Sequence, residues 1–418
     1  MGFENSGGGI GVISATLLVA GGMAGSGVLA LPRALVDSGW IGLVLIILFC
    51  INSAYGGTRL GKSWDILEER YPEYKGSTRD PYPAIAEKAM GKYGRYLVTV
   101  CNSVCLFGVG TVFIILASQI FEELLSDIAP KITFCLWLLI IGALLTPLSW
   151  LGSPKDFWFV GLGAISTTSA SCLAIFIQMM MEGTDSNAIA PVYEQHGAKE
   201  FFVSFGVILF AFGGASTFPT IQNDMADRKK FSLSVTIGYI ILLIIYLPVA
   251  IGGFLVYGES VQDNIILSLK KSPLVTTANC FMALHLTMAF LIITNPISQE
   301  IEGFLNIQPK FNAKRCLVRS GMVCLMVFVA ESVPQFGVIL ALLGGTTVAI
   351  SAFILPQICY MLLCNQETKD FPKRHIAWYY RTYMWLLVAI GVLGGAASTY
   401  SALESMFNSH FRKPCYWP

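Results

Sequence analysis

The sequence predicts an all-α integral membrane protein with about eleven transmembrane helices, and three observations lead to this class. The 418 residues are 55% hydrophobic and 13% charged, whereas an average soluble domain is ~25% charged. Apolar runs long enough to cross a bilayer of ~30 Å recur along the whole chain. Two of these runs contain glycines near their middle and close with a proline.

The apolar runs form two sets of five, followed by a single last run. They cover approximately 9–36, 39–62, 95–120, 132–151 and 157–181, then 201–223, 233–257, 274–299, 316–333 and 335–363, and finally 379–404. The ninth run is the weakest, because Arg319 lies near one end and Glu331 near the other. We expect one membrane domain over 1–418, with repeats at 1–181 and 201–363 and an extra helix at 379–404.

The basic residues predict the orientation of the chain in the membrane. If the N-terminus is cytoplasmic, 20 of the 27 Lys and Arg residues fall on the inner side. The outer side then keeps Arg33, Lys131, Lys199, Lys270, Lys271, Arg412 and Lys413. The positive-inside rule favours this arrangement, with the C-terminus extracellular or lumenal. Both the plasma membrane and a lysosomal or vacuolar membrane are compatible with it.

The longest inner loop is predicted to contain a short amphipathic helix. Asp80 and Pro81 are suited to its N-cap and first turn, the apolar residues up to Met90 share one side, and Gly91 ends it. One interpretation is an ordinary solvated loop helix. The other is a lid or a brace on the inner membrane surface.

Composition also excludes several kinds of partner. The formal net charge is +1 and there is no basic tail, so the sequence gives no reason to expect nucleic acid binding. Most of the eleven cysteines lie inside apolar runs, where cysteine packs as a small hydrophobic residue. There is no Cys-x-x-Cys pair and no Cys/His metal spacing. We therefore expect neither a disulfide framework nor a metal site, and the sequence carries no signal for an oligomeric state.

The first run contains an interruption at Gly21–Pro32, with the sequence GGMAGSGVLALP. Four glycines and a serine weaken the helix in its middle. An unpaired backbone N–H or C=O costs several kcal/mol in hydrocarbon, so a break persists only where it lines a cavity or binds a ligand. This stretch is therefore the first candidate for a binding site.

The sixth run repeats this design at Phe210–Pro219, with the sequence FAFGGASTFP. Two interrupted helices, each opening a set of five spans, indicate an inverted repeat with the binding site between the interruptions. Because the first set contains an odd number of spans, the second set enters the membrane in the opposite direction. The alternative is that these glycines only permit helices to pack closely.

Several motifs, in this order, resemble the amino acid/auxin permease family, whose members are similar in fold to LeuT-type transporters. They are GSGVLALP (25–32), YPAIAEKAMGKYGRYLV (82–98), FGGASTFPTIQNDM (212–225), VPQFGVILALLGGT (333–346) and FILP (353–356). The resemblance implies a 5+5 inverted repeat with helices 1 and 6 broken, plus one C-terminal helix. It implies a secondary active transporter for small amino acids, a symporter that works by alternating access, and not an enzyme. The cysteine pair familiar from the family's outer loops is not evident.

Binding a zwitterionic amino acid requires donors for its carboxylate. If the first helix restarts near Val28, the N–H groups of Ser26, Gly27 and Val28 lie at a helix N-terminus, which carries about half a positive charge. The glycines, Gly25 included, let the backbone approach the ligand closely, and the Ser26 hydroxyl adds a donor. We predict that this end of the helix binds the carboxylate.

Binding the ammonium group requires acceptors, which the interruptions supply as backbone carbonyls. The candidates are Gly21, Gly22 and Met23 in the first run and Ala211, Phe212, Gly213 and Gly214 in the sixth. No charged residue occurs between Ile10 and Leu31 or between Phe201 and Asn223, so we expect a pocket for neutral amino acids. Phe212 and Phe218 are either walls of this pocket or packing residues.

The coupling ion is predicted from the few ionisable groups inside the runs. His285 is the candidate for a proton-coupled step, because imidazole titrates near physiological pH. Its alternative is a hydrogen-bonded structural role. A sodium site formed by Thr287 with the carbonyls of Gly22 and Met23 is the competing hypothesis. We expect proton coupling and no cofactor.

Charged residues at the ends of the runs are interpreted as gates. Arg33 and Asp37 have the i,i+4 spacing of an ion pair and form a candidate outer gate. A second interpretation is that Arg33 attracts the substrate carboxylate. Glu300 and Glu302 at the inner end of the eighth run are interpreted as interfacial or gating ion-pair residues.

Other classes of protein receive less support from the sequence. An amino acid sensor that keeps the fold without transport is the main alternative. Enzyme motifs such as HExxH and GxSxG do not occur, nor does a filter sequence of the kind found in potassium channels. The expected partners are therefore an amino acid and the lipid bilayer.

Overall fold

The computed structural model describes residues 9–76, 78, 80–150, 157–186, 190–308, 311–407 and 414–417. The expectations that concern residues 1–8, and those that concern the charges of Arg79, Lys155, Lys310, Arg412 and Lys413, lie outside these residues.

The described chain is helical, with no named strand. Its α-helices are α1 (Val12–Met23), α2 (Ser26–Ser38), α3 (Trp40–Arg70), α4 (Pro81–Met90), α5 (Lys92–Leu125), α6 (Phe134–Trp150), α7 (Phe157–Gly183), α8 (Ala198–Ala211), α9 (Phe218–Asn223), α10 (Phe231–Tyr257), α11 (Pro273–Phe304), α12 (Ala313–Ser332), α13 (Phe336–Leu343), α14 (Leu355–Asn365) and α15 (Trp378–Phe407). A π-helical segment, η5 (Gly344–Ile354), joins α13 to α14. Short 3₁₀ turns lie at Pro72–Tyr74, Arg228–Lys230, Gly258–Ser260 and Ile265–Ser268.

Seven helical stretches in the described part of the chain are long and apolar enough to cross a membrane, and the bent pair α1–α2 makes an eighth. The predicted all-helical membrane class is therefore confirmed. The other predicted runs coincide with shorter or more polar helices. These are α6, the pair α8 and α9, and α12.

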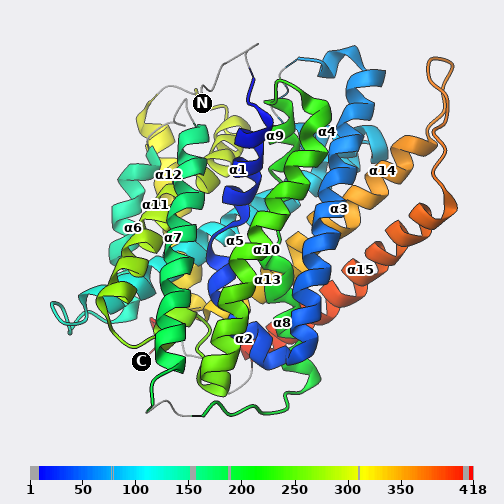
Figure 1. Ribbon diagram of the computed structural model, residues 1–418. Helices are drawn as coiled ribbons and strands as arrows, with labels where there is room; N and C mark the ends of the chain where they lie inside the picture. Colours follow the sequence, from blue (N-terminus) through cyan, green and yellow to red (C-terminus); the bar gives the residue numbers. More distant parts are fainter. Residues whose placement is uncertain are drawn as a thin grey trace.

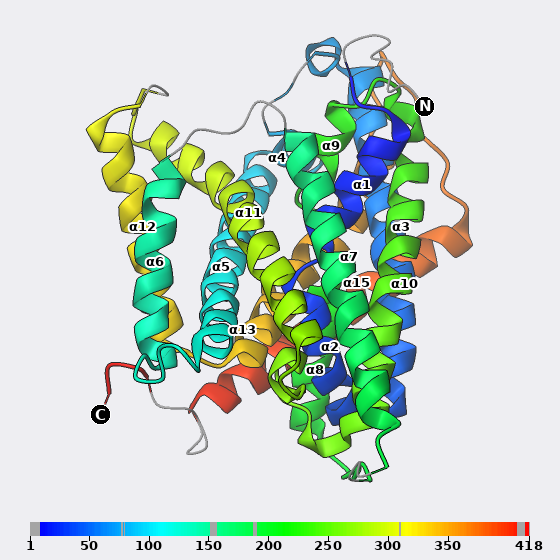
Figure 2. The same cartoon turned by 60° about the vertical axis from the view of Figure 1, so that its left-hand side comes forward.

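Helices α1 and α2 run through the centre of the bundle, one above the other in Figure 1. They pack against α7, α8 and α10, while α5 and α11 complete the surrounding wall. A separate group, α6 with α12, lies at the edge of the bundle beside α5 in Figure 2. α15 lies obliquely against α8 and η5. This arrangement places both interrupted runs in the interior.

The start of the first interrupted run and the end of the second are joined by backbone hydrogen bonds. The N–H of Ile10 donates to the carbonyl of Asp224 (2.9 Å), and the N–H of Ala226 donates to the carbonyl of Ile10 (3.0 Å). These bonds form an isolated parallel bridge between Ile10 and Met225. The segment that enters α1 is therefore fixed to the segment that leaves α9.

The predicted amphipathic helix is α4, and it packs as a brace. Its residues Pro81, Tyr82, Ala84, Ile85 and Ala86 are buried, and Gly91 ends it with a φ of +77°. The Tyr82 hydroxyl donates to the carbonyl of Ser351 in η5 (2.6 Å). Asp80 occupies the N-cap position without a side-chain cap bond. The helix is thus anchored to a distant span, which excludes the solvated alternative.

A disulfide joins Cys135, at the start of α6, to Cys415 in the C-terminal segment. The expectation of no disulfide is wrong here, because the partners are 280 residues apart and Cys135 lies in an apolar run. Further contacts hold the same segment: the N–H of Cys415 donates to the Glu331 carbonyl (2.9 Å), and Tyr416 stacks on Phe328. The C-terminal segment is therefore fixed to α6 and α12.

The weak ninth run becomes α12 because its cation is paired inside the protein. Arg319 is 2% exposed and donates from Nε to Oε1 of Glu302 (2.6 Å). Its Nη1 donates to the Ser149 carbonyl (2.7 Å) and its Nη2 to Oδ1 of Asn295 (3.1 Å). Arg315 reaches the same Glu302 oxygen at 3.3 Å. These contacts confirm the ion-pair interpretation of Glu302 and connect α12 with α6 and α11.

We expect Glu302→Gln to destabilise the protein strongly, because it leaves the buried Arg319 charge without its carboxylate. Breaking a buried pair in this way typically costs about 3–5 kcal/mol. Glu300→Gln is the matched control, since Glu300 lies two residues earlier and is exposed, with Ser103 as its partner. Thermal unfolding in detergent measures the difference, and equal melting temperatures for both variants would contradict the prediction.

Candidate functional site

The first interrupted run breaks at Ala24 and Gly25, which we call the first break. α1 ends at Met23, α2 begins at Ser26, and their axes differ by 55°. The helix restarts two residues before the expected Val28. The N–H groups of Ser26, Gly27 and Val28 thus belong to the first turn of α2, where backbone donors have no intrahelical acceptor.

The second break comprises residues 212–217, between the end of α8 at Ala211 and the start of α9 at Phe218. It lies within the interruption predicted from the sequence. Phe212 and Gly213 close the end of α8 with backbone hydrogen bonds to Leu209 and Phe210. Beyond them, the carbonyl of Gly214 accepts from the N–H (3.1 Å) and from the hydroxyl (3.0 Å) of Thr217.

The two breaks touch each other. A Cβ atom added to Gly27 would lie 2.7 Å from Cα of Ala211, and one added to Gly214 would lie 2.4 Å from Cγ of Met23. Gly27 is therefore needed for a backbone-to-backbone approach between α2 and α8. The sequence prediction that both interruptions contribute to one site agrees with this contact.

Two tyrosines of α10 hold both breaks in place. The Tyr246 hydroxyl donates to the carbonyl of Met23 (2.9 Å), and the Tyr239 hydroxyl donates to the carbonyl of Phe212 (3.0 Å). Both side chains are buried, and their spacing of seven residues places them on one face of the helix. Sequence reasoning missed them, although two tyrosines at this spacing in an apolar run are a usable signal.

These hydrogen bonds from the tyrosines reduce the number of backbone carbonyls at the breaks that are free to accept from a ligand. The carbonyls of Met23 and Phe212 each already accept one hydrogen bond. Those of Gly21 and Gly22 end α1 without an intrahelical partner, as the last carbonyls of any helix do. Gly22 is also exposed, and a Cβ added to it would meet no atom within 4 Å. Open space therefore borders the carbonyl end of α1.

Phe212 and Phe218 do not border this space. Both side chains are fully buried. The ring of Phe212 lies 5.6 Å from that of Tyr246, and the ring of Phe218 lies 6.1 Å from that of Tyr239. The structure therefore favours the packing interpretation for both phenylalanines. Their rings pack against the rings of Tyr246 and Tyr239.

His285 lies beside the first break with one nitrogen bound and the other unpaired. Its Nδ1 is 2.9 Å from Oγ1 of Thr168 and 3.2 Å from the carbonyl of Ala164, both on α7. A carbonyl only accepts, so this contact places the ring proton on Nδ1 and makes Nε2 the acceptor of the neutral ring. Nε2 is buried and has no hydrogen-bond partner among the described residues.

The unpaired nitrogen faces the start of α2. A Cβ added to Gly25 would lie 3.0 Å from Nε2 of His285 and 4.0 Å from the ring of Phe113. Thr287, the other predicted coupling residue on α11, donates to its own helix at Ala283 (2.9 Å). Because residues two positions apart point to opposite sides of a helix, Thr287 faces away from this break.

The C-terminal half of α2 carries an ion-pair cluster that is larger than predicted. Arg33 contacts Oδ1 of Asp37 at 2.5 Å and Oε1 of Glu259 at 2.9 Å, while His196 contacts Oε2 of Glu259 at 2.9 Å. The predicted Arg33–Asp37 pair is present. Glu259 and His196 were missed, because they come from distant outer segments. With two carboxylates around it, Arg33 is neutralised, which favours pairing over capture of the substrate.

Asp37, His196 and Glu259 also lie close enough together to hold a metal ion. The guanidinium of Arg33 already contacts both carboxylates of this cluster. A cation there would have to displace it against the charge of the arginine. The cluster is therefore a set of ion pairs that joins α2 to the segments that carry His196 and Glu259.

Comparison with known proteins agrees with this geometry. Residues 8–404 match the family model described as "Transmembrane amino acid transporter protein". The chain is 26% identical to amino acid transporter AVT1J of Arabidopsis thaliana, covering 92% of this chain and 89% of that protein. It is 27% identical to lysine histidine transporter-like 1 of the same plant, covering 89% and 83%.

Solved structures show the same fold at low sequence identity. MhsT in complex with L-phenylalanine superposes with a TM-score of 0.59 at 12% identity, covering 93% of this chain and 98% of that one. A manganese transporter of Eremococcus coleocola superposes with a TM-score of 0.61 at 13% identity, covering 96% and 88%. Both are LeuT-type transporters. On the family match, the chain belongs to the transmembrane amino acid transporter proteins, a family of membrane transporters and not of enzymes.

Proposed function

We propose that this protein is a secondary active transporter that moves small neutral amino acids by alternating access, with the substrate bound between the two breaks. The observation that carries the proposal is the contact between two interrupted helices beside open space. The leading N–H groups of α2 and the last carbonyls of α1, which have no intrahelical partners, lie at this break.

Each end of an amino acid has a matching set of backbone groups. The N–H groups of Ser26, Gly27 and Val28 bind the carboxylate, helped by the positive end of the helix dipole. The carbonyls of Gly21 and Gly22 accept from the ammonium group. From the second interrupted run, Ala211 at the end of α8 and Gly213 and Gly214 in the second break supply backbone for the same group.

Selectivity for neutral amino acids follows from the absence of charge around the breaks. Neither interrupted run carries an acidic or basic side chain within its break, and the bound tyrosine hydroxyls are neutral donors. A cationic or anionic side chain would be buried there without a partner, which is costly. The relative named for lysine and histidine makes cationic amino acids the comparison to test.

Proton coupling is supported by the surroundings of His285. Its unpaired Nε2 lies next to Gly25, where proton binding would change the charge beside the substrate carboxylate. The sodium alternative has weaker support, because Met23 already accepts from Tyr246 and Thr287 faces away. We therefore assign the coupling step to His285 and the cation to a proton.

The proposed architecture has eleven spans, with repeats at 1–181 and 201–363 and an extra helix at 379–404. Each repeat opens with an interrupted helix, α1–α2 in the first and α8–α9 in the second. α1 begins at one end of the bundle and α15 finishes at the other (Figure 1), as an odd number of crossings requires.

The proposed orientation has the N-terminus in the cytoplasm. Besides the basic residues, the Cys135–Cys415 disulfide supports it, because disulfides persist in extracellular and lumenal compartments and are rare in the cytosol. Both cysteines belong to the side assigned as outer. This fits the plasma membrane or a vacuolar or lysosomal membrane.

We expect purified protein in proteoliposomes to accumulate radiolabelled neutral amino acids when an inward proton gradient is imposed. Lysine and glutamate should compete weakly. A sodium gradient without a proton gradient should give no accumulation. Uptake indifferent to both gradients would contradict secondary active transport, and binding without uptake would identify a sensor.

Gly27→Ala is expected to abolish uptake, since even one methyl group would collide with the Ala211 backbone. Gly321→Ala is the control, because a Cβ at this α12 glycine meets no atom within 4 Å. Both variants should insert and purify normally by size-exclusion chromatography. Near-normal uptake by Gly27→Ala would refute the proposed contact between the breaks.

His285→Ala should lose proton-driven accumulation, while exchange of amino acid across a membrane without gradients persists. Thr287→Ala on the same helix should retain both activities. Uptake and exchange measured side by side separate coupling from binding. An active His285→Ala that depends on sodium, together with an inactive Thr287→Ala, would establish the competing sodium site.

A further inference from the structure

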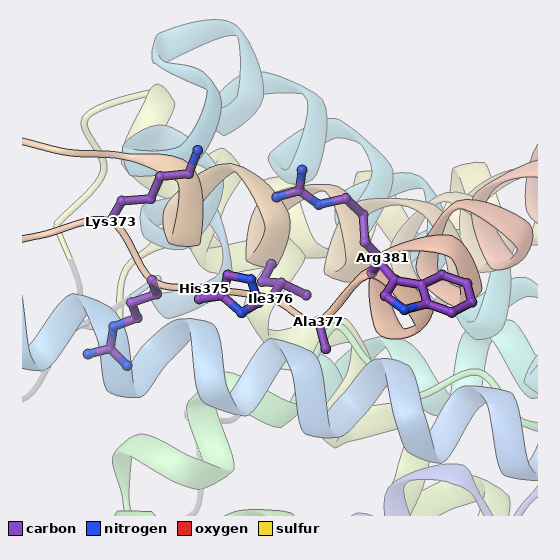
Figure 3. A pocket seen from close by; sticks show the side chains of 7 residues that line it. Lys373, His375, Ile376, Ala377 and Arg381 are labelled. Atoms are coloured by element: carbon purple, nitrogen blue, oxygen red, sulfur yellow. The ribbon is translucent and has the colours of Figure 1, made fainter.

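A cavity lies between the end of α14 and the start of α15. It has a volume of about 380 Å³ and is open on one side. Four basic residues of one short segment line it: Lys373, Arg374, His375 and Arg381. Figure 3 shows Lys373 and Arg381 extending toward the same side of this segment, with His375 between them.

The basic residues differ in whether they already have an ion-pair or hydrogen-bond partner. Arg374 donates to Oε2 of Glu69 on α3 at 2.5 Å, so its charge is balanced. Arg381 donates to Oδ1 of Asn365 at 2.8 Å, but its buried Nε has no acceptor within the described chain. Lys373 and His375 form no ion pair or side-chain hydrogen bond among the described residues. The cavity therefore has unused donors.

The first turn of α15 adds to this anion-attracting environment. α15 begins at Trp378 and is 30 residues long, and its leading N–H groups have no intrahelical acceptor. Such a helix end favours a phosphate group. Basic side chains and a helix N-terminus thus converge on one open cavity.

Aromatic residues place this cavity at the level of the lipid headgroups. Trp378 lines the cavity and is 77% exposed, and the next residues, Tyr379 and Tyr380, are also exposed. Tryptophan and tyrosine gather at the boundary between membrane and water. The apolar body of α15 continues directly from these residues into its membrane span.

We propose that this cavity binds the phosphate of an anionic phospholipid headgroup. Lys373, His375 and the guanidinium of Arg381 supply donors to the phosphate, and the indole of Trp378 packs along the lipid. Basic pockets at the cytoplasmic ends of transmembrane helices suit such headgroups. A lipid is favoured over soluble phosphate because the cavity opens beside the interfacial aromatic residues of α15.

Binding there would add a further connection between α3, α14 and α15, which already pack against one another. Arg381 already joins α15 to the last residue of α14, and Arg374 joins the segment to α3. A phosphate shared by Lys373 and Arg381 would fix the start of α15 against α14. The lipid would thus stabilise the transporter without entering the site between the breaks.

The test uses full-length protein in phosphatidylcholine nanodiscs that contain increasing fractions of phosphatidylserine. Native mass spectrometry counts the retained anionic lipid, and thermal unfolding reports stabilisation. The Lys373→Gln/Arg381→Gln variant should need about ten-fold or more anionic lipid for the same occupancy. Lys229→Gln/Lys230→Gln removes the same charge from the same end of the bundle and should behave as the native protein does.

Further measurements test whether unfolding of the variant or binding of a soluble phosphate explains the result. Lys373→Gln/His375→Gln should weaken lipid binding while it keeps the Arg381–Asn365 contact, so its effect is not one of unfolding. Glycerophosphoserine and inorganic phosphate should give no comparable stabilisation in pure phosphatidylcholine. The proposal is overturned if the Lys229→Gln/Lys230→Gln control loses as much anionic lipid as the Lys373→Gln/Arg381→Gln variant, or if neither variant loses any. It is also overturned if inorganic phosphate stabilises the protein as well as the lipid does.

Discussion

The structure depends on one constraint: a helix interrupted inside a membrane must find partners for its freed backbone groups. Water is absent from the bilayer core, so each unpaired carbonyl is costly. Tyr246 and Tyr239 meet this requirement at the first and second break, respectively, from a single face of α10. The helix that stabilises the breaks also fixes their spacing, so α10 sets the geometry of the site.

The same constraint explains why the remaining groups are suited to a ligand. The tyrosines occupy the carbonyls of Met23 and Phe212 and leave those of Gly21 and Gly22 beside open space. In the proposed binding mode, the ammonium group of the substrate completes the hydrogen bonding of these two carbonyls. Nε2 of His285 is in a similar position, since its ring is held through Nδ1 while the other nitrogen faces Gly25. Groups that are costly when empty contribute affinity when a polar ligand fills them.

Local signals in the sequence were sufficient for the helices, both breaks, the brace α4 and the Arg33–Asp37 pair. Glycine, proline and apolar periodicity determine each of these within a few residues. Contacts between distant segments were not predicted. These are Glu259 and His196 around Arg33, Arg319 with Glu302, and Cys415 with Cys135. Each of these depends on how the helices pack, which one sequence does not show. The role of Phe212 was ambiguous for the same reason, because burial decides between a wall and a packing residue.

The bridge between Ile10 and Met225 constrains any motion of α1 relative to α9. The segment before α1 and the segment after α9 share two backbone hydrogen bonds, and neither depends on side-chain identity. Swinging α1 alone would break both bonds in one step. In the proposed mechanism, α1 and α9 therefore move as one unit, with bending at Ala24–Gly25 and at residues 212–217, and access from the proposed cytoplasmic side requires both helices to move together.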